Sequence, residues 1–577
     1  MEDANRAHCD RLCAVGDDTD LVRQVRALLD AGRPGLALAP CRAYLAAHRD
    51  DPVAMHLMGE VYLMLGQVAT AEQWLQSAVA RAPALRDQPG FVLTRNGIEA
   101  AKLTEQAEDQ QKSGRFQQAM QSLTRAADLL PNLPWPVNNL GNLCMSLGRL
   151  DEAMNHFRAA AYHADRPMRQ AHSNLLMAML HSDRVTPRQL LDEHRAWAGR
   201  YPRNRIVAPP PVIDPPDPDR PIRVGYISPD FRRHPVAMFM LPVLTNHDPA
   251  RCEITCYSDV TGEDAMTRRL RAAGHRWVDC AAMPIEKLFD QIRQDRIDIL
   301  IDLAVHSGSN RQPLLASRPA PIQMTWLGYA GTTGSPAIDY RITDSVVDPP
   351  GLTESHFTER LLRLPEIFWC FAPPEEAPGL VERAGDVRRI RFGTATRLAK
   401  ITPTCLDLWA SLLRHVPDSL LCLAADPFAD PAALRDWIDQ CAARGIGPDR
   451  LDLRPAMDYR EYLAFLGSID IGLDTFPFNG GTTVCHTLWM GTPVVALTGA
   501  TSAARITASI LTALGRPEWI AATPDEWVRI NVRLATGTRP GRAALRQQMQ
   551  RSGLCDGARF ARGLEAAFRE VFRARCG

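Results

Sequence analysis

The chain has 577 residues, 46% of them hydrophobic, and its 66 basic and 66 acidic side chains leave no formal net charge. Domains are commonly about 150 residues long, so the length predicts three or four folded units. A broad grip on DNA or RNA requires clustered positive charge, and we therefore expect no nucleic-acid partner.

Cysteine usage and the N-terminal sequence predict the compartment. The chain opens on polar residues without a signal-peptide core, and it contains no run of about 18 uncharged apolar residues that could span a membrane. Its 14 cysteines are scattered, with no CxxC pair and no Cys and His at metal-ligand spacing. We therefore predict a cytoplasmic protein with reduced thiols, no membrane span, no metal site and no cofactor.

A regular spacing of glycine and alanine marks the first third of the chain. Successive glycines are 34, 48 and 34 residues apart, and an alanine follows each of them five positions later. The glycines are Gly32, Gly66, Gly114 and Gly148, and the alanines are Ala37, Ala71, Ala119 and Ala153. Glycine ends a helix at little cost and alanine lets two helices approach closely. This spacing resembles the 34-residue tetratricopeptide repeat (TPR), with an insertion around 87–97, and predicts a helical solenoid whose concave groove binds peptide segments.

A proline-rich stretch separates this region from the rest. A helical segment near 167–200 comes first, and five prolines then occur within residues 209–216, which predicts a stiff, extended linker. The expected domains are a helical repeat domain at 1–204, a linker at 205–220, and two further domains at 221–375 and 376–577.

The last two-thirds of the chain alternates short apolar runs with helical segments. The runs expected to be strands are 223–229, 253–259, 276–280 and 298–304, and, after a Pro-rich gap near 366–378, 390–395, 419–425, 451–456, 469–474 and 493–497. Strands that alternate with helices form parallel sheets with right-handed crossovers. Two such blocks predict two Rossmann-like domains that face a cleft, with ligands bound where the strands end.

The segment 474–493 has the features of an anion site. Gly480 and Gly481 allow a tight turn after the strand, and Thr482 and Thr483 then open a helix whose first N–H groups are free. Such a helix start suits a diphosphate. The alternative is a tight turn with a threonine cap.

Lys400 follows the first strand of the second block and precedes a helix that opens at Pro403. From there it could reach the same phosphates and neutralise the charge that builds on a leaving nucleotide. The alternative is a solvated surface lysine.

Histidines and glycines follow the strands of the first block. His234 lies in the loop after the opening strand, and His306 and Gly308 follow a later strand. Tyr329 belongs to a third glycine-rich loop, and His275 precedes the strand at 276–280. These positions make the five residues candidates for the acceptor side of the cleft, although a lone histidine is more often structural.

Three segments together resemble the O-linked N-acetylglucosamine transferase family, in its SPINDLY-type branch. They are residues 318–344, 398–403 and 473–495, within a resemblance that extends over roughly 223–530. The resemblance implies a GT-B architecture, in which two Rossmann-like lobes follow the TPR helices and the second lobe binds the nucleotide-sugar. It also implies metal-independent, inverting transfer of a sugar to Ser or Thr hydroxyls of polypeptides.

The resemblance also implies roles for individual residues. Lys400 should meet the diphosphate, which Thr482 and Thr483 hold at the helix start beside Gly480 and Gly481. Tyr462 should lie against the base, and His234 should line the cleft near the acceptor and the sugar. UDP-N-acetylglucosamine is the donor that the family favours.

Two positions depart from the family's pattern. Arg397 stands in a segment where relatives often carry asparagine or glutamine, and it could contact phosphate. His486 stands where many relatives carry a carboxylate that accepts ribose hydroxyls. Both departures leave other donors open, such as GDP-fucose or a CMP-linked nonulosonic acid. A TPR scaffold with a decayed transferase domain is a further alternative, but it need not keep the intact Lys400, Thr482 and Thr483.

Overall fold

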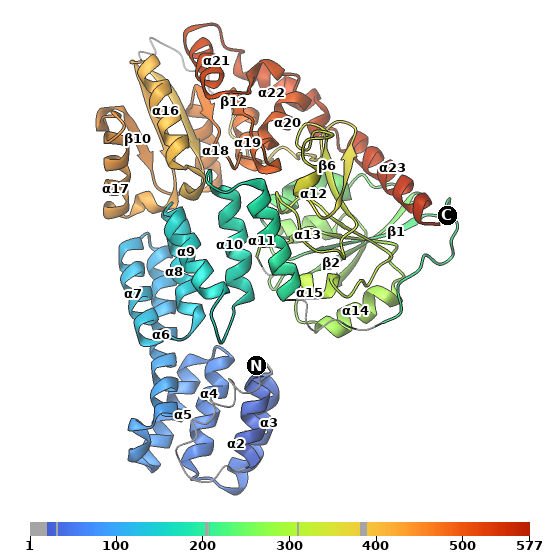
Figure 1. Ribbon diagram of the computed structural model, residues 1–577. Coiled ribbons are helices and arrows are strands. Elements are labelled where there is room, and N and C mark those ends of the chain that lie inside the picture. Colours follow the sequence, from blue (N-terminus) through green and yellow to red (C-terminus); the bar gives the residue numbers. More distant parts are fainter. Residues whose placement is uncertain are drawn as a thin grey trace. The chain divides into compact units, whose positions relative to one another are not determined.

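The computed structural model describes residues 20–30, 33–201, 206, 208–308, 311–380 and 389–576 (Figure 1). They fall into two compact units. The first comprises the described residues up to Leu143 together with Asn155–Ala171, and the second comprises Cys144–Met154 together with the described residues from His172 onward.

Antiparallel helical hairpins build the first unit. Its helices are α2 (Asp20–Asp30), α3 (Pro34–Ala47), α4 (Pro52–Met64), α5 (Val68–Arg81), α6 (Pro89–Lys112) and α7 (Phe116–Leu129). Gly66 and Gly114 have φ values of 74° and 70°. Each lies between the two helices of one hairpin, Gly66 between α4 and α5 and Gly114 between α6 and α7. The alanines five residues later, Ala71 and Ala119, are completely buried. The predicted glycine and alanine roles are therefore confirmed at these repeats, whereas Gly32 lies outside the described residues.

The insertion predicted around 87–97 in the long glycine interval is helical. The interval holds a short 3-10 helix (Pro83–Asp87) and then α6, which is 24 residues long. The added residues thus lengthen a helix.

Four further helices lie between α7 and the first strand: α8 (Pro134–Ser146), α9 (Leu150–Ala161), α10 (Arg169–His181) and α11 (Pro187–Arg200). Gly148, with a φ of 77°, separates α8 and α9 of the last predicted repeat. From His172 onward, α10 and α11 belong to the second compact unit, so the division between units falls earlier in the chain than the proline-rich stretch.

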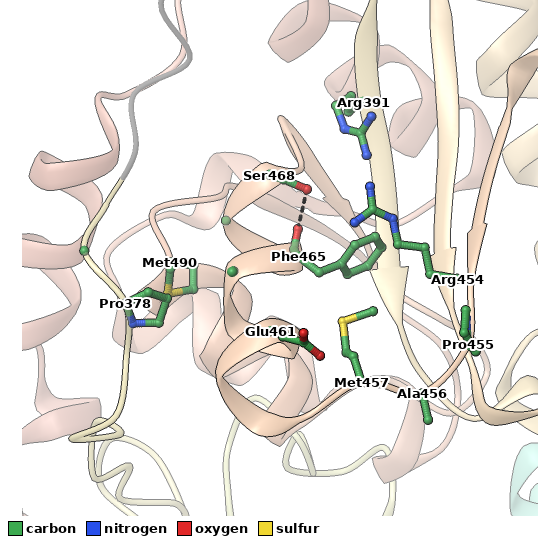
Figure 2. Close-up of a pocket in the computed structure, with 13 residues that line it drawn as sticks. Pro378, Arg391, Arg454, Pro455, Ala456, Met457, Glu461, Phe465, Ser468 and Met490 are labelled. Carbon is green, nitrogen blue, oxygen red and sulfur yellow. Dashed lines mark hydrogen bonds between the residues drawn. The ribbon is translucent and has the colours of Figure 1, made fainter. Parts of the chain in front are cut away.

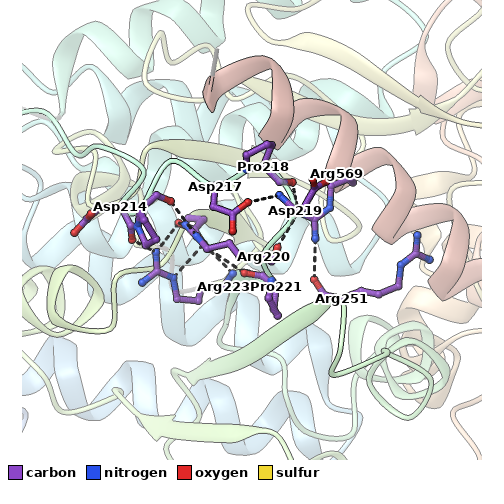
Figure 3. Close-up of polar contacts among 11 residues, drawn as sticks. Asp214, Asp217, Pro218, Asp219, Arg220, Pro221, Arg223, Arg251 and Arg569 are labelled. Atoms are coloured by element: carbon purple, nitrogen blue, oxygen red, sulfur yellow. Dashed lines mark hydrogen bonds and ion pairs between the residues drawn. The ribbon is translucent and has the colours of Figure 1, made fainter.

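Ion pairs and hydrogen bonds connect the proline-rich stretch to the rest of the second unit (Figure 3). Arg220 and Arg223 both pair with the buried Asp298, at 2.7 and 3.0 Å. From the C-terminal helix, Arg569 donates to the carbonyl oxygens of Pro218 and Arg220 at 2.6 and 2.8 Å. The described part of this stretch is therefore bound to the body of the unit along its second half.

Two parallel sheets form the second unit. The sheet of the first lobe has the order β3-β2-β1-β4-β5-β6-β7 and that of the second lobe β10-β9-β8-β11-β12-β13. The first contains β1 (Ile222–Ser228), β2 (Cys252–Ser258), β3 (Arg276–Asp279), β4 (Ile299–Asp302), β5 (Ile322–Thr325), β6 (Tyr340–Asp344) and β7 (Arg360–Leu364). The second contains β8 (Ile390–Ala395), β9 (Ser419–Ala424), β10 (Leu451–Arg454), β11 (Ile471–Leu473), β12 (Val494–Leu497) and β13 (Ile520–Ala521). In each sheet the strand order reverses beside the first strand of the lobe in sequence, which is β1 or β8, as in a Rossmann fold. The predicted fold class is therefore confirmed.

Helices pack on both sheets. Those of the first lobe are α12 (Pro235–Leu244), α13 (Ala265–Arg271), α14 (Ile285–Gln294) and α15 (Gln312–Leu315). Those of the second are α16 (Pro403–His415), α17 (Pro431–Ala442), α18 (Tyr459–Ser468), α19 (Thr482–Trp489), α20 (Ile506–Ala513), α21 (Pro524–Thr536) and α22 (Arg542–Arg551). The last helix, α23 (Gly557–Cys576), returns to the first lobe and contacts β1, β7 and α12 (Figure 1). None of the described helices combines the length and apolar composition needed to cross a bilayer.

Candidate active site

The loop between β11 and α19 is held in a fixed shape by one carboxylate. Asp474 Oδ1 accepts hydrogen bonds from the backbone N–H groups of Thr475 and Gly480, at 2.9 and 2.7 Å. Gly481 is the N-cap of α19 and provides no side-chain cap, so the first N–H groups of the helix remain available. A Cβ atom on Gly481 would lie 2.4 Å from the Trp369 ring, which explains the need for glycine here.

Lys400 reaches this loop from the neighbouring strand. It ends a short 3-10 helix after β8, and β8 pairs with β11 at the point where the strand order reverses. Its Nζ donates to the carbonyl oxygen of Asn479 at 3.0 Å and lies 4.2 Å from the centroid of the Phe478 ring. Burial lowers the pKa of Lys400 to about 8, against the opposing effect of Asp474. The structure thus brings together Lys400 and the glycine loop, both of which lie where ligands bind in such sheets.

His486 and Tyr462 lie together behind the start of α19. The hydroxyls of Tyr462 and Tyr459 are 3.2 and 3.1 Å from the Nδ1 and Nε2 atoms of His486. Burial lowers the pKa of His486 to about 4, so the ring is neutral, with one nitrogen donating and the other accepting. Because both nitrogens are engaged, His486 is placed to orient the two tyrosines, whereas the sequence suggested direct contact with ribose.

His234 and Asp230 form a second group, in the loop between β1 and α12. The backbone N–H of Val236 donates to His234 Nδ1 at 3.3 Å, so the proton of the neutral ring is on Nε2. Burial, with Arg232 and Arg397 nearby, lowers the pKa of His234 to about 4. Asp230 Oδ2 lies 3.6 Å from Nδ1, and burial raises the pKa of Asp230 to about 6.

Arg397 connects these groups electrostatically. It is exposed in the loop after β8, and its charge helps to lower the pKa values of His234 in the first lobe and Lys400 in the second. Arg397 is therefore within electrostatic range of both His234 and Lys400, as a single cleft requires.

His306 and Tyr329 lie in packing contacts with α10 and α11. Ser173 Oγ is 3.3 Å from His306 Nδ1, and the Trp197 ring meets the His306 ring edge-on at 4.7 Å. The Tyr329 hydroxyl donates to His194 Nε2 at 2.7 Å, because His194 Nδ1 donates to a backbone carbonyl. Both residues are almost fully buried, so the structure places them inside the unit and not in an open acceptor cleft.

Backbone geometry and a hydrogen bond account for the other two candidates of the first lobe. Gly308 is exposed and has a φ of 65°, which accounts for glycine through backbone geometry alone. His275 Nε2 donates to the carbonyl oxygen of Leu244 at 2.6 Å, immediately before β3 begins. The amino end of a parallel strand lies at the edge opposite to the ligand-binding loops, so His275 caps α12.

A pocket on another face of α18 contains none of the predicted site residues (Figure 2). Arg391 and Arg454 point into it, but both are paired with Asp452, and Met457 and Phe465 supply an apolar wall. Its charges are therefore balanced within the chain, and we do not assign it to the donor site.

The sequence pattern failed to identify two groups that lie beside the predicted site residues. Asp230 could have been found, since it precedes His234 by four residues in the same loop after a strand. His181 ends α10 and stacks on Phe478, with 4.5 Å between ring centroids. Nothing in the helical pattern of residues 167–200 indicates which surface that histidine meets.

Known proteins resemble the chain over both of its parts. The sequence matches glycosyl transferase family 41 over residues 213–384 and 387–562, and tetratricopeptide repeats over 22–85 and 111–178. The structure is similar to that of a mutant O-GlcNAc transferase of Thermobaculum terrenum, with 32% identity and a TM-score of 0.72, covering 97% of this chain and 99% of that one.

Curated relatives carry the name "Probable UDP-N-acetylglucosamine--peptide N-acetylglucosaminyltransferase SPINDLY". That of Hordeum vulgare is 38% identical over 422 residues, which are 71% of this chain and 44% of the relative. That of Arabidopsis thaliana is 37% identical over 429 residues, which are 71% of this chain and 46% of the relative. The chain thus spans less than half the length of these relatives. Because the family match extends over more than half of its residues, the chain belongs to glycosyl transferase family 41.

Proposed function

We propose that the chain transfers N-acetylglucosamine from UDP-N-acetylglucosamine to Ser or Thr hydroxyls of polypeptides. The observation that carries the proposal is Lys400, bonded to Asn479 directly beside the glycine loop that opens α19. The names of the curated relatives and of the Thermobaculum terrenum protein support this donor and this acceptor class.

The second lobe would stabilise the departing nucleotide. Cleavage of the bond between sugar and diphosphate leaves negative charge on the diphosphate, and preorganised donors at that position lower the barrier. Lys400, with a pKa of about 8, is mostly protonated at neutral pH, and the N–H groups of Thr482 and Thr483 add partial positive charge. These groups replace a metal ion in the proposal, so transfer should persist in excess EDTA. Loss of activity with EDTA that Mg²⁺ or Mn²⁺ restores would contradict this part.

The first lobe would handle the proton of the acceptor hydroxyl. Asp230 is ionised at neutral pH, yet its pKa of about 6 makes it a stronger base than an ordinary aspartate. His234, which is neutral and carries its proton on Nε2, can donate a hydrogen bond to the acceptor or the sugar. In this assignment Asp230 accepts the proton, directly or through water, while His234 orients the reactants.

Tyr462 remains the proposed contact to the nucleotide base. Its hydroxyl is held by His486, and its ring stacks on Tyr459 at 6.1 Å with 15° between planes. Arg233 lies over the Tyr459 ring at 5.0 Å, so a residue of the first lobe covers this group. The arrangement supports a base-binding surface built from α18 and stabilised from the opposite lobe.

We also propose that the TPR helices recruit polypeptide acceptors by their groove and that the protein acts in the cytoplasm. The twelve described cysteines are all free thiols, ten of them buried, which fits a reducing compartment. The groove is tested by deleting residues 1–133, which keeps α8 to α11. Slower transfer to long protein acceptors, with nucleotide binding unchanged, is expected, because tethering raises the effective acceptor concentration. Equal rates for both forms would remove the recruiting role.

The nucleotide preference is the direct test of the donor. UDP should raise the melting temperature more than GDP or CMP. One observation favours a second candidate: exposed Arg397, which faces the cleft group, could pair with the carboxylate of a CMP-linked nonulosonic acid. A larger shift with CMP would favour that donor, and a larger shift with GDP would favour GDP-fucose.

A further inference from the structure

A helix that precedes both sheets in the sequence contacts the proposed phosphate loop. His181 is the last residue of α10, and only 5% of its surface is exposed. Its imidazole lies parallel to the Phe478 ring, with 9° between planes and 4.5 Å between centroids. Phe478 itself lies two residues before Gly480, so this stack reaches the loop that opens α19.

The same phenyl ring also contacts the ammonium group of Lys400. An ammonium group near the face of an aromatic ring is attracted by the negative potential of that face. Lys400 Nζ lies 4.2 Å from the ring centroid, and its bond to Asn479 adds a second point of attachment to the same loop. The orientation of Phe478 therefore helps to fix where the positive charge of Lys400 lies.

His181 has the properties of a structural partner and not of a base. Its Nδ1 donates to the carbonyl oxygen of Met177 at 2.7 Å. Burial, with Lys400 and Arg397 nearby, lowers the pKa of His181 to about 3. The ring is thus neutral at every pH at which the enzyme is expected to work, and it adds no charge that would repel Lys400.

We propose that His181 is a positioning residue for sugar transfer: its stack on Phe478 holds that ring, and through it the Lys400 ammonium, where the donor diphosphate binds. This inference rests on the proposed function and adds α10 to the parts that the reaction requires. Without the stack, Phe478 can change rotamer and water can enter. Lys400 then becomes better hydrated and less fixed in position.

The test compares three variants in transfer from UDP-N-acetylglucosamine to a peptide. His181→Ala should lower kcat about 5- to 30-fold, the range for loss of a buried contact of this kind. His181→Phe keeps a flat ring on Phe478 and should restore most of that loss. His415→Ala is the matched control, because His415 also ends a helix and donates from Nδ1 to the carbonyl four residues earlier, at 2.9 Å, but is exposed. It should leave kcat unchanged.

The pH profile separates positioning from mere stability. Burial sets the pKa of Lys400 near 8, and the groups that face it are Asp474, Arg397 and neutral His181. Protonated Lys400 is the active form, so kcat/KM should fall as pH rises through that value. Water admitted by His181→Ala raises the pKa of Lys400, so this fall should move to higher pH. His181→Phe and His415→Ala should keep it in place.

A folded His181→Ala variant with unchanged kcat and an unchanged pH profile overturns the inference. If that variant does not fold, Phe478→Leu takes its place, since it removes the ring that both His181 and Lys400 contact. An unchanged pH profile of kcat/KM in Phe478→Leu would likewise overturn the inference. The proposed function fails separately. If Lys400→Ala is as active as the unmodified protein, the proposed function is wrong, whereas an inactive Lys400→Ala beside a fully active His181→Ala removes only the role of His181.

Discussion

The two lobes share a strand order but carry opposite chemistry where that order reverses. In the first lobe the reversal lies between β1 and β4, where Asp230 in the loop after β1 and Asp302 at the end of β4 supply two carboxyl groups. Burial raises the pKa of each to about 6. In the second lobe it lies between β8 and β11, where Lys400 and the start of α19 supply positive charge. Topology thus places the site in both lobes, and the loop residues decide what it does.

The two carboxyl groups of the first lobe also differ from each other. Asp302 accepts hydrogen bonds from two backbone N–H groups, at 3.0 and 3.1 Å, and from Gln312 at 2.6 Å. Asp230 has its side-chain neighbours at longer distances, with the charged Arg232 at 3.8 Å and the neutral His234 at 3.6 Å. Asp302 therefore stabilises its loop, while Asp230 is the group with capacity for a substrate proton.

Removal of the positive charge from the second lobe should have the largest effect. We expect Lys400→Ala to lower kcat by at least about 10²-fold, since one preorganised group that stabilises developing charge is worth that much. Circular dichroism should show an intact fold, and Lys287→Ala, at an exposed position of α14, is the control. Near-normal turnover of folded Lys400→Ala would break the contrast between the lobes.

The matching change in the first lobe is Asp230→Asn. We expect kcat to fall about 10²-fold, as for loss of a general base, with nucleotide affinity unchanged. The carboxylate is the active form, so in the unmodified enzyme kcat/KM should fall as pH drops through about 6. That acidic limb should disappear in Asp230→Asn. Asp302→Asn should instead lower the melting temperature. If only Asp302→Asn lost the acidic fall of kcat/KM, Asp302 would be the proton acceptor and Asp230 the structural carboxylate.

The glycine that opens α19 offers a steric test. Gly481→Ala places a methyl group against the rigid Trp369 ring and should displace the loop, weakening nucleotide binding about 10-fold or more, in line with 1.4 kcal/mol or more of lost contact. Gly541→Ala is the control, because Gly541 also precedes a helix but has open space around its Cβ position. Unchanged affinity in Gly481→Ala would mean that the diphosphate does not depend on this loop.

The smallest expected effect concerns nucleotide recognition. His486→Ala should weaken nucleotide binding by roughly 1–2 kcal/mol, as for one or two lost hydrogen bonds. The cause would be loss of orientation of Tyr459 and Tyr462, whose hydroxyls it contacts. Calorimetry supplies the measurement. Equal affinities of His486→Ala and the unmodified protein would remove these tyrosines from the base-binding surface.

Local sequence patterns predicted the parts of the fold that local physics controls. The strands β8 and β11, the glycine loop and Lys400 followed from short apolar runs and from the lysine and glycines in the loops after them. The short strands β5, β6 and β7 were not predicted as strands, since their runs are interrupted by polar residues. In β5, for example, the side-chain amide nitrogen of the buried Gln323 donates to the carbonyl oxygens of Leu315 and Ala337, a pairing that exists only in the folded chain.

Tertiary partners account for the predictions about the site that the structure does not support. His306 and Tyr329 follow strands, as cleft residues do, but the helices α10 and α11 cover them. A helical pattern specifies an apolar face without specifying what covers it, so the sequence grouped α10 and α11 with the repeats. The same limit concealed the stack of His181 on Phe478.

Transfer itself is the measurement that tests the central claim most directly. The purified chain is incubated with a Ser- and Thr-containing peptide and with UDP-N-acetylglucosamine, GDP-fucose or a CMP-linked nonulosonic acid, and products are read by mass spectrometry. We expect the peptide to gain one N-acetylhexosamine from the UDP-linked donor, and the gain to vanish with Lys400→Ala. Modification by another donor alone, or none by any donor that binds, would contradict the proposed N-acetylglucosamine transfer.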